Sequence, residues 1–322
     1  MEKLFAYLEQ EVPRVNAHLK KEVDEMDALV RDVVAHCLLG KGKRVRPLLT
    51  LLTARALGHH SDDAYPIACS LEMIHAASLL HDDILDDADT RRGKAAAHTL
   101  WGPGQAILAG DLLLGLAVMR GGEYDLPRLS YLLSKGIYDT VAGEILEISG
   151  VKKPRIDMEA YMEIIIGKTA RLIETATRCG AALASRDSEV EEAMGQYGRD
   201  VGIAFQLIDD ALDYVAPADT MGKPEGGDLR EGKVTLPLIY YLEDISEAEQ
   251  EEILLGMKES SLSAEKQAAI VKAVREGGYE ERTKQAAQKH IDSAIKALDV
   301  LPSCEERDVL VEIAGYVLSR KK

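Results

Sequence analysis

The sequence has little positive charge for its length. Among its 322 residues, 39 are Lys or Arg and 55 are Asp or Glu, which gives a formal net charge of −16 at pH 7. Nucleic acids and anionic lipid surfaces select proteins with clustered positive charge. We therefore expect no nucleic-acid partner. In so acidic a chain, any local cluster of basic residues becomes informative.

The sequence also lacks segments that would place the chain in a membrane. The first residues, MEKLFAYLEQEVPRV, mix charged and apolar side chains and contain no apolar block of the signal-peptide kind. No apolar run reaches the ~20 residues that a bilayer requires, and the longest candidate, residues 106–119, contains Asp111. The four cysteines are dispersed, with no CxxC pair. These features predict a soluble, cytoplasmic protein with reduced thiols that does not span a membrane.

Proline and aromatic residues are scarce too, at 10 residues and 5% of the chain. This composition favours helices, and we find no convincing strand alternation. The stretch 66–80, PIACSLEMIHAASLL, is apolar on more than one side and predicts a helix in the centre of a bundle. The expected fold is all-α, a single domain over residues 1–322, with about ten or more helices around a deep central cavity. Other long helices are predicted over residues 105–119, 129–148, 158–185 and 189–215.

The residues HDDILDD follow this apolar stretch directly. Asp82 and Asp86 are four residues apart and would share one face of a helix, with Asp83 beside them. Carboxylates at this spacing repel one another unless a cation lies between them. A solvated acidic helix end is the alternative. No DxDxDG loop is present, so the motif is not an EF-hand.

A second motif of the same kind comprises Asp209, Asp210 and Asp213, again after apolar residues. Two such motifs, each ending an apolar helix, are difficult to explain as solvated faces. Mg²⁺ takes oxygen ligands and usually binds through one or two carboxylates together with substrate phosphates. Two motifs that face each other across a cavity would hold several divalent ions around one polyanion.

Two basic clusters supply a counterpart to the aspartates. The segment GKGKRVRP includes Lys43 and Arg46, and the segment RRGK includes Arg91 and Arg92. Arginine binds phosphate oxygens in a bidentate manner, and lysine acts as a mobile point charge. Neither segment is a P-loop, because GxxxxGK[ST] is absent. We interpret both clusters as anion-binding sites.

Single polar residues in apolar surroundings complete the pattern. His75 lies two helical turns before Asp82 and faces the same way, although a lone histidine is more often a satisfied core residue. Lys168 interrupts an apolar helix, and Gln206 lies one turn before Asp209. Metal ligands and phosphate binders in an apolar cavity suit the ionisation of a diphosphate ester. Apolar walls would keep water away from the carbocation.

Six segments occur along nearly the whole chain: GKGKRVRP (40–47), EMIHAASLLHDDILDDADTRRGK (72–94), AILAGDLLL (106–114), GKTA (167–170), FQLIDDALDY (205–214) and GKPEGGDLREGKVTLPLI (222–239). In this order they resemble the trans-isoprenyl diphosphate synthase (polyprenyl synthetase) family. The resemblance implies the isoprenoid synthase type I fold and a homodimer. It also implies head-to-tail (1′-4) condensation of isopentenyl diphosphate onto an allylic diphosphate such as geranyl or farnesyl diphosphate.

The resemblance also implies roles for individual residues. Three Mg²⁺ ions per active site are expected, with Mn²⁺ as the alternative ion; their direct ligands would be Asp82, Asp86 and Asp209, supported by Asp83, Asp210 and Asp213. The allylic diphosphate would contact Arg91, Lys168 and Lys223, and the isopentenyl diphosphate would contact Lys43, Arg46, His75 and Arg92. Thr169 and Gln206 would stabilise the cation, and Lys233 would help to close the site.

Product length should depend on the residues one turn before the first motif. Ala77 and Ser78 are small and would leave the path of the growing chain open, so the floor would lie deeper, at Ile74 or beyond. Each further turn of helix offers ~5 Å, about one isoprene unit. We expect a hexaprenyl to octaprenyl product, C30–C40, of the kind used for quinone side chains, with transient membrane contact for its release.

Four alternatives stay open at this point. One is a short-chain synthase that makes farnesyl or geranylgeranyl diphosphate. Another is a non-catalytic subunit of a heteromeric synthase, which the two intact aspartate motifs argue against. A class I terpene cyclase or a head-to-head condensing enzyme would share the fold, but a cyclase needs no second basic diphosphate site. The last is an acidic helical protein that binds metal adventitiously.

Overall fold

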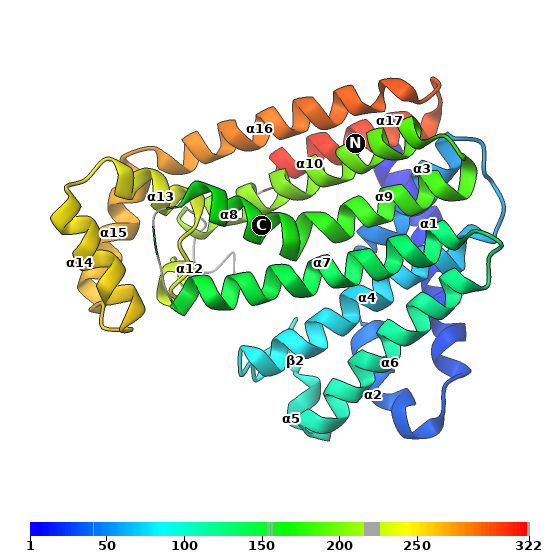
Figure 1. Cartoon of the computed structure of the whole chain (residues 1–322), viewed down its shortest axis with the longest axis horizontal. Helices are drawn as coiled ribbons and strands as arrows, with labels where there is room; N and C mark the ends of the chain where they lie inside the picture. Colours follow the sequence, from blue (N-terminus) through cyan, green and yellow to red (C-terminus); the bar gives the residue numbers. More distant parts are fainter. Residues whose placement is uncertain (41, 153–154, 156, 216–225, 321–322) are drawn as a thin grey trace. The chain divides into compact units, whose positions relative to one another are not determined.

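The computed structural model describes residues 1–40, 42–152, 155, 157–215 and 226–320. Apart from one small hairpin, the elements in these ranges are helices (Figure 1), which confirms the all-α prediction. The elements are α1 (Glu2–Asp24), α2 (Ala28–Leu38), α3 (Val45–Ala56), α4 (Ala64–Leu85), β1 (Thr90–Arg91), β2 (Lys94–Ala95), α5 (Ala97–Trp101), α6 (Pro103–Gly122), α7 (Pro127–Lys152), α8 (Met158–Ile165), the π-helix η1 (Ile166–Ala170), α9 (Arg171–Ala184), α10 (Ser188–Asp213), α12 (Gly227–Arg230), α13 (Leu236–Glu243), α14 (Glu247–Lys258), α15 (Ala264–Glu276), α16 (Tyr279–Ala297), the 3₁₀ turn η2 (Leu298–Val300) and α17 (Glu305–Leu318).

The chain divides into two compact units, and each is described by itself. The first unit comprises Met1–Tyr138, Leu172–Gly198 and Ala297–Ile313. The second comprises Asp139–Arg171, Arg199–Lys296 and Ala314–Lys322. The expectation of a single domain stays a prediction.

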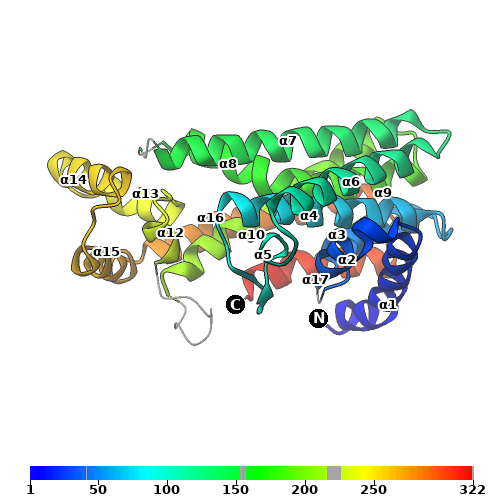
Figure 2. The same ribbon diagram turned by 90° about the horizontal axis from the view of Figure 1, so that it is seen from below.

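Helix α4 is the core helix of the first unit. Most of its residues between Ala64 and Leu80 are buried, and it packs against α3 and α6 (Figures 1 and 2). Its apolar side chains occupy several faces, so neighbours on more than one side are needed to cover them. The Ser70 hydroxyl donates to the carbonyl of Pro66 at 2.9 Å, which satisfies a buried polar group within the helix. The predicted helix over 66–80 is confirmed, and it continues to Leu85 through the aspartates.

A short hairpin follows the first aspartate motif. Strands β1 and β2 are antiparallel, with Thr90 opposite Ala95. The turn residues Arg92 and Gly93 have φ values of +52° and +76°, the left-handed backbone that a two-residue hairpin turn requires. Strands of two residues are too short to show alternation in the sequence. The hairpin fixes the backbone positions of Arg91 and Arg92.

In the second unit, α13, α14 and α15 gather near one end of α16 (Figure 1). Their apolar faces form a buried cluster with Tyr214, which follows α10, and Leu229 on α12. Tyr214 directly follows the last residue of the second aspartate motif, and Leu229 lies further along the chain on α12. The cluster therefore holds α12 close to the end of α10.

Helix α6 is the one helix among the described residues that is long and apolar enough to cross a membrane by length and composition. Of its apolar window, 33% is buried. Leu113 and Ala117 are buried, whereas Leu108 and Met119 are exposed. One side of α6 therefore packs within the first unit, and its outer side exposes apolar side chains together with Asp111.

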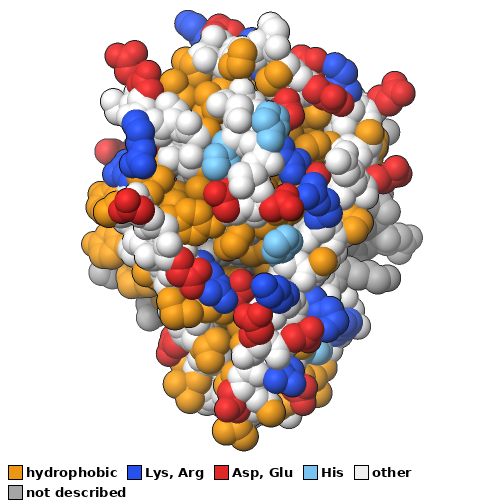
Figure 3. Space-filling view, turned by 90° about the vertical axis from the view of Figure 1, so that its right-hand side faces the viewer, with side chains coloured by type: hydrophobic (Ala, Val, Ile, Leu, Met, Phe, Trp, Pro, Cys, Tyr) orange, Lys and Arg blue, Asp and Glu red, His pale blue; other side chains and the backbone are white. Residues whose placement is uncertain are grey.

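Figure 3 shows the distribution of charge on one face of the molecule. Lys and Arg side chains lie among Asp and Glu side chains there, and the described residues on this face form no broad positive patch. Intermingled charges of this kind are typical of an ordinary solvated surface.

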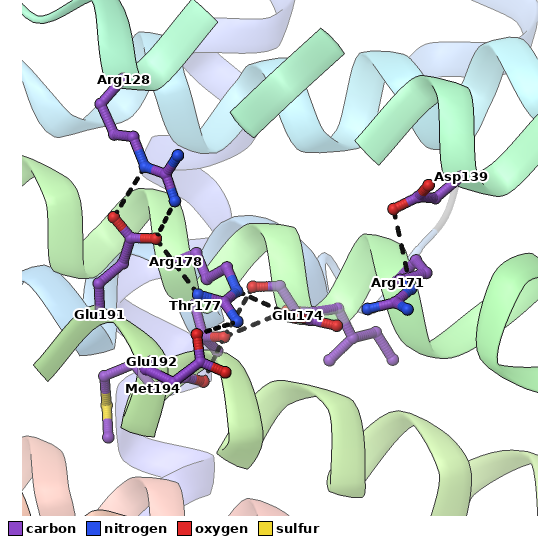
Figure 4. Close-up of polar contacts among 10 residues, drawn as sticks. Arg128, Asp139, Arg171, Glu174, Thr177, Arg178, Glu191, Glu192 and Met194 are labelled. Atoms are coloured by element: carbon purple, nitrogen blue, oxygen red, sulfur yellow. Dashed lines mark hydrogen bonds and ion pairs between the residues drawn. The ribbon is translucent and has the colours of Figure 1, made fainter. Parts of the chain in front are cut away.

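A network of ion pairs joins α7, α9 and α10 within the first unit (Figure 4). Arg178 contacts Glu174 at 2.9 Å, Glu191 at 3.2 Å and Glu192 at 2.7 Å. Arg128 donates two further bonds to Glu191, at 3.0 and 2.6 Å. Burial alone would raise the pKa of Glu191, but the two arginines outweigh it and the pKa is lowered. Glu191 is the carboxylate that both arginines share.

We expect Glu191→Gln to destabilise the protein by about 2–4 kcal/mol at pH 7, because two arginines lose their common partner. A pKa lowered by folding adds stability above the unfolded value of about 4.3, and this stability is lost as the pH falls through the folded value. The difference from wild type should therefore shrink on acidification. Urea unfolding at several pH values measures it. The control is Glu192→Gln, because that side chain is 65% exposed. Equal losses in the two variants would contradict the assignment.

Candidate active site

The second aspartate motif lies at the end of α10, where Asp210 is buried. Both of its carboxylate oxygens accept hydrogen bonds. Gln206 Nε2 donates to Oδ1 at 2.8 Å, and the Tyr161 hydroxyl donates to Oδ2 at 2.5 Å. The Thr169 hydroxyl donates to Gln206 Oε1 at 3.0 Å. Predicted residues Thr169, Gln206 and Asp210 therefore meet in one chain of hydrogen bonds, together with Tyr161, which the sequence did not reveal.

The other two aspartates of this motif have separate partners. Asp213 accepts the backbone N–H groups of Gly227 and Asp228, both at 3.1 Å, and so ties the end of α10 to α12. Asp209 accepts a bond from Arg320 at 3.0 Å. Arg320 follows α17, and its role could not be read from spacing.

The carboxylates in this part of the second unit crowd one another. Burial raises the pKa of Asp210 and of Asp228, and the negative charge of Asp213 adds to both shifts. Among the described residues, no three carboxylate, thiol or imidazole groups converge in a metal-binding arrangement. Internal donors instead engage the oxygens. Buried carboxylates that repel one another nevertheless fit a divalent cation, which would relieve the repulsion. Asp228 was not among the predicted residues.

A π-helix separates α8 from α9, where the sequence predicted one continuous helix over 158–185. It contains Gly167, Lys168 and Thr169. A Cβ atom on Gly167 would lie 2.6 Å from Gly143 Cα, and one on Gly143 would lie 2.4 Å from the backbone nitrogen of Lys168. Two backbones thus touch where α7 meets the π-helix. Single π-helical turns are frequent at functional sites.

Two lysines converge on a carboxylate of α7. Lys168 Nζ lies 2.9 Å from Glu147 and 3.0 Å from Glu144, and Lys233 Nζ lies 3.2 Å from Glu147 and 2.9 Å from Glu231. Burial would lower the pKa of Lys168, but its carboxylate partners outweigh burial and raise it. Both lysines therefore stay charged. Glu144 and Glu147 were not among the predicted residues, although their spacing of three in an apolar helix was a usable signal.

Both lysines line a cavity of about 440 Å³ together with Glu147, Asp210 and Asp228. Lys223, predicted to bind the allylic diphosphate, lies outside the described residues. Apolar side chains and small residues make up much of the remaining wall. The lining residues on which the argument depends are Leu146, Glu147, Tyr161, Ile164, Ile165, Lys168, Thr169, Gln206, Asp210, Asp228 and Lys233.

In the first unit, the first aspartate motif lies at the end of α4. Asp82 is half-buried, Asp83 is buried, and Asp86 is exposed as the C-terminal capping residue. The backbone N–H of Asp86 donates to the carbonyl of Asp82 at 2.8 Å, which keeps the two residues one turn apart as predicted. Arg91 Nε donates to Asp83 Oδ1 at 2.6 Å. Arg91, expected at the allylic diphosphate, thus contacts a carboxylate of the motif here.

A group of cations surrounds His75 in the first unit. Burial and then the charges of Arg46, Arg92, Arg91 and Arg44 lower the pKa of His75 well below its usual range, so the ring is neutral. The Nε atom of Arg46 is buried and has no hydrogen-bond partner among the described atoms. An anion that bound here would satisfy this N–H group.

One cation of the GKGKRVRP cluster has a structural use. Arg44 is buried, and it contacts Glu72 and the carbonyl of Gly40, each at 2.8 Å. Lys43 is exposed, whereas Lys41 lies outside the described residues. The cluster therefore contributes fewer cations to an anion site than its composition suggests.

The three residues predicted to control chain length lie on α4. Ile74 and Ala77 are buried, and Ser78 is half-buried with its hydroxyl bonded to the carbonyl of His75 at 2.9 Å. A second cavity, of about 210 Å³, has Leu79 and Leu80 in its wall. Arg91, Arg92 and Asp83 also line it. Neither of the two cavities described here is lined by Ile74, Ala77 or Ser78.

Comparison with known proteins identifies the family of the chain. A sequence model described as Polyprenyl synthetase matches residues 27–274. The chain belongs to the polyprenyl synthetase family. It is 35% identical to octaprenyl diphosphate synthase of Escherichia coli over 100% of this chain and 99% of that one. It is 37% identical to a short chain isoprenyl diphosphate synthase of Methanothermobacter thermautotrophicus over 89% of each.

Solved structures of the polyprenyl synthetase family agree with this result. The structure of a polyprenyl synthase from Caulobacter crescentus, complexed with calcium and isoprenyl diphosphate, has a TM-score of 0.90 to this chain. It shares 32% identity and covers 100% of this chain and 98% of its own. The chain is therefore a prenyltransferase with trans-prenyl diphosphate synthase activity, on the all-α isoprenoid synthase fold.

We expect Gly167→Ala to reduce both stability and prenyl transfer. The added methyl group would collide with the backbone of α7 and shift Lys168 and Thr169, at a cost of about 1–3 kcal/mol. Thermal unfolding and turnover measure the two effects. The control is Gly315→Ala on α17, where a Cβ would meet nothing within 4 Å. This substitution should raise the free energy of unfolding by at most ~1 kcal/mol, because alanine favours a helix more than glycine does. Similar behaviour of the two variants would show that the Gly143–Gly167 contact is not limiting.

Proposed function

We propose that this enzyme joins isopentenyl diphosphate head-to-tail (1′-4) to an allylic diphosphate, geranyl or farnesyl diphosphate, in a Mg²⁺-dependent reaction. One observation carries the proposal: crowded carboxylates, of which Asp210 is buried, and two charged lysines line a single cavity together with apolar side chains. A diphosphate and a divalent cation satisfy both charge signs, and the apolar wall suits a prenyl chain.

The two aspartate motifs would hold the metal. The ligand set is Asp82, Asp86 and Asp209, with Asp83, Asp210 and Asp213 in support. Bound Mg²⁺ would supply positive charge that stabilises the leaving diphosphate, and Mn²⁺ is the alternative ion. The number of ions, three per active site, is part of the proposal. The calcium in the Caulobacter crescentus structure supports a site for divalent cations in the family.

The cationic residues would bind the two diphosphates. Lys168, Lys223 and Arg91 would hold the allylic diphosphate, with Lys233 closing the site. The isopentenyl diphosphate would contact Lys43, Arg46, His75 and Arg92. The unpartnered Nε of Arg46 supports this second site. Thr169 and Gln206 would turn their oxygens toward the allylic cation, and the departing diphosphate would accept the final proton.

The purified protein should convert labelled isopentenyl diphosphate only when an allylic primer and Mg²⁺ are both present, and EDTA should abolish turnover. Asp209→Asn should lower the rate by at least about 100-fold, because a metal ligand is lost. The control is Asp125→Asn, at an exposed position before α7. No turnover with any primer would favour the alternative of a non-catalytic subunit.

Two further parts of the proposal concern assembly and location. We propose a homodimer, because α6 and the first half of α7 expose apolar side chains. Light scattering measures its mass. We also propose a cytoplasmic location with transient membrane contact during product release, which fractionation of cells would check. The exposed side chains are Ile107, Leu108, Met119, Tyr131 and Tyr138.

We further propose a hexaprenyl to octaprenyl product, C30–C40. The relatives include an octaprenyl synthase and a short-chain synthase, so similarity supports either length. The small side chains of Ala77 and Ser78 favour the longer product, because no bulky group stands one turn before Asp82. A farnesyl or geranylgeranyl product is the alternative.

Ala77→Tyr should shorten the product to a few isoprene units, since an aromatic ring would block the growing chain. Chromatography of the labelled products measures their length, and thermal unfolding checks that the variant folds. Ser78→Ala is the control, because it removes a hydroxyl without adding volume and should leave the length unchanged. A full-length product from folded Ala77→Tyr would disprove the assignment of this position.

A further inference from the structure

Four polar side chains in the wall of the 440 Å³ cavity form one continuous chain of hydrogen bonds. It runs from Tyr161 on α8 to Asp210 and Gln206 on α10, and ends at Thr169 on the π-helix. The three donor–acceptor distances are 2.5, 2.8 and 3.0 Å. Three elements of the second unit are therefore joined through side chains alone.

The direction in which each hydrogen bond of this series is donated follows from the donors and acceptors available. Both oxygens of the Asp210 carboxyl group accept hydrogen bonds, and Gln206 turns its NH₂ group toward Oδ1. The amide oxygen of Gln206 then points away from Asp210 and accepts from Thr169. The orientation of the Gln206 amide thus depends on where the Asp210 carboxylate is held.

Tyr161 is the group that holds the second oxygen of this carboxylate. Its side chain is buried, and its hydroxyl donates to Asp210 Oδ2 at 2.5 Å. Without this donor, Oδ2 would compete for the NH₂ group of Gln206, and the carboxylate could rotate.

We propose that Tyr161 is a positioning residue for prenyl transfer. Through Asp210 it fixes the Gln206 amide so that the oxygens of Gln206 and Thr169 present negative charge to the allylic cation. The inference rests on the proposed function and extends it to a residue that no motif contains. Because it acts on the cation, Tyr161 should affect the chemical step more than the binding of either diphosphate.

Tyr161→Phe keeps the shape of the side chain and removes the hydroxyl. We expect kcat to fall about tenfold, since misplaced catalytic groups lose this much or more, with both KM values within about twofold of wild type. The matched control is Tyr197→Phe, which removes another buried hydroxyl that donates to the carbonyl of Leu310 at 2.8 Å. Equal changes of kcat in the two variants would overturn the inference.

A binding measurement tests the same point without turnover, so it remains decisive if the proposed function fails. Calorimetry compares an allylic diphosphate analogue that carries an ammonium group at the position of the cation with a neutral thio analogue. Tyr161→Phe should weaken the ammonium analogue about tenfold and leave the neutral one unchanged. Equal weakening of both, or of neither, would overturn the inference.

Two further measurements separate this role from a role in metal binding. In a Gln206→Ala background, Tyr161→Phe should cause little additional loss, because its effect passes through Gln206. Multiplicative losses would contradict the inference. The Mn²⁺ affinity of Tyr161→Phe should equal that of wild type. A kcat restored by excess metal would instead assign Tyr161 to the metal site.

Discussion

The backbone contact between Gly143 and Gly167 is the constraint on which the site in the second unit depends. Side chains at these positions would hold α7 and the π-helix apart, since either Cβ would lie within 2.6 Å of the opposing backbone. At this close approach, Lys168 reaches two carboxylates of α7, while Thr169 reaches Gln206. Chemistry that uses long polar side chains is thus organised by two residues that have none.

The two units carry opposite local imbalances of charge. Around His75, several guanidinium groups lie close enough to keep the imidazole neutral. Around Asp210, carboxylates lie close enough to raise one another's pKa. Like charges held together in partly buried positions destabilise a protein unless a ligand compensates them. An enzyme whose substrates are diphosphates and whose cofactor is a cation receives both kinds of compensation from what it binds.

The site residues that could be predicted from the sequence stand out by their residue type, by their spacing or by their apolar surroundings. The aspartates recur with one spacing after apolar helices, and Lys168 stands out in an apolar run. Tyr161 could not be found in this way, because its role comes from a contact between α8 and α10 that no local pattern encodes. Asp228 looked like any residue of a charged loop, and Arg44 looked like another anion binder until its contact with Glu72 was known. The long helices could be predicted from hydrophobic spacing. The π-helix could not, because this spacing tolerates one extra residue.

That extra residue has a consequence for insertions and deletions. A π-helical turn accommodates one more residue than an α-helical turn, so the removal of one residue between 166 and 170 would leave a continuous α-helix. Because the wide turn already absorbs the extra residue, the side chains before and after it would keep roughly their relative directions. The flanking helices would survive, but the widened turn that carries Lys168 and Thr169 would be lost. In this segment, the length of the chain matters to catalysis as much as the identity of any residue in it.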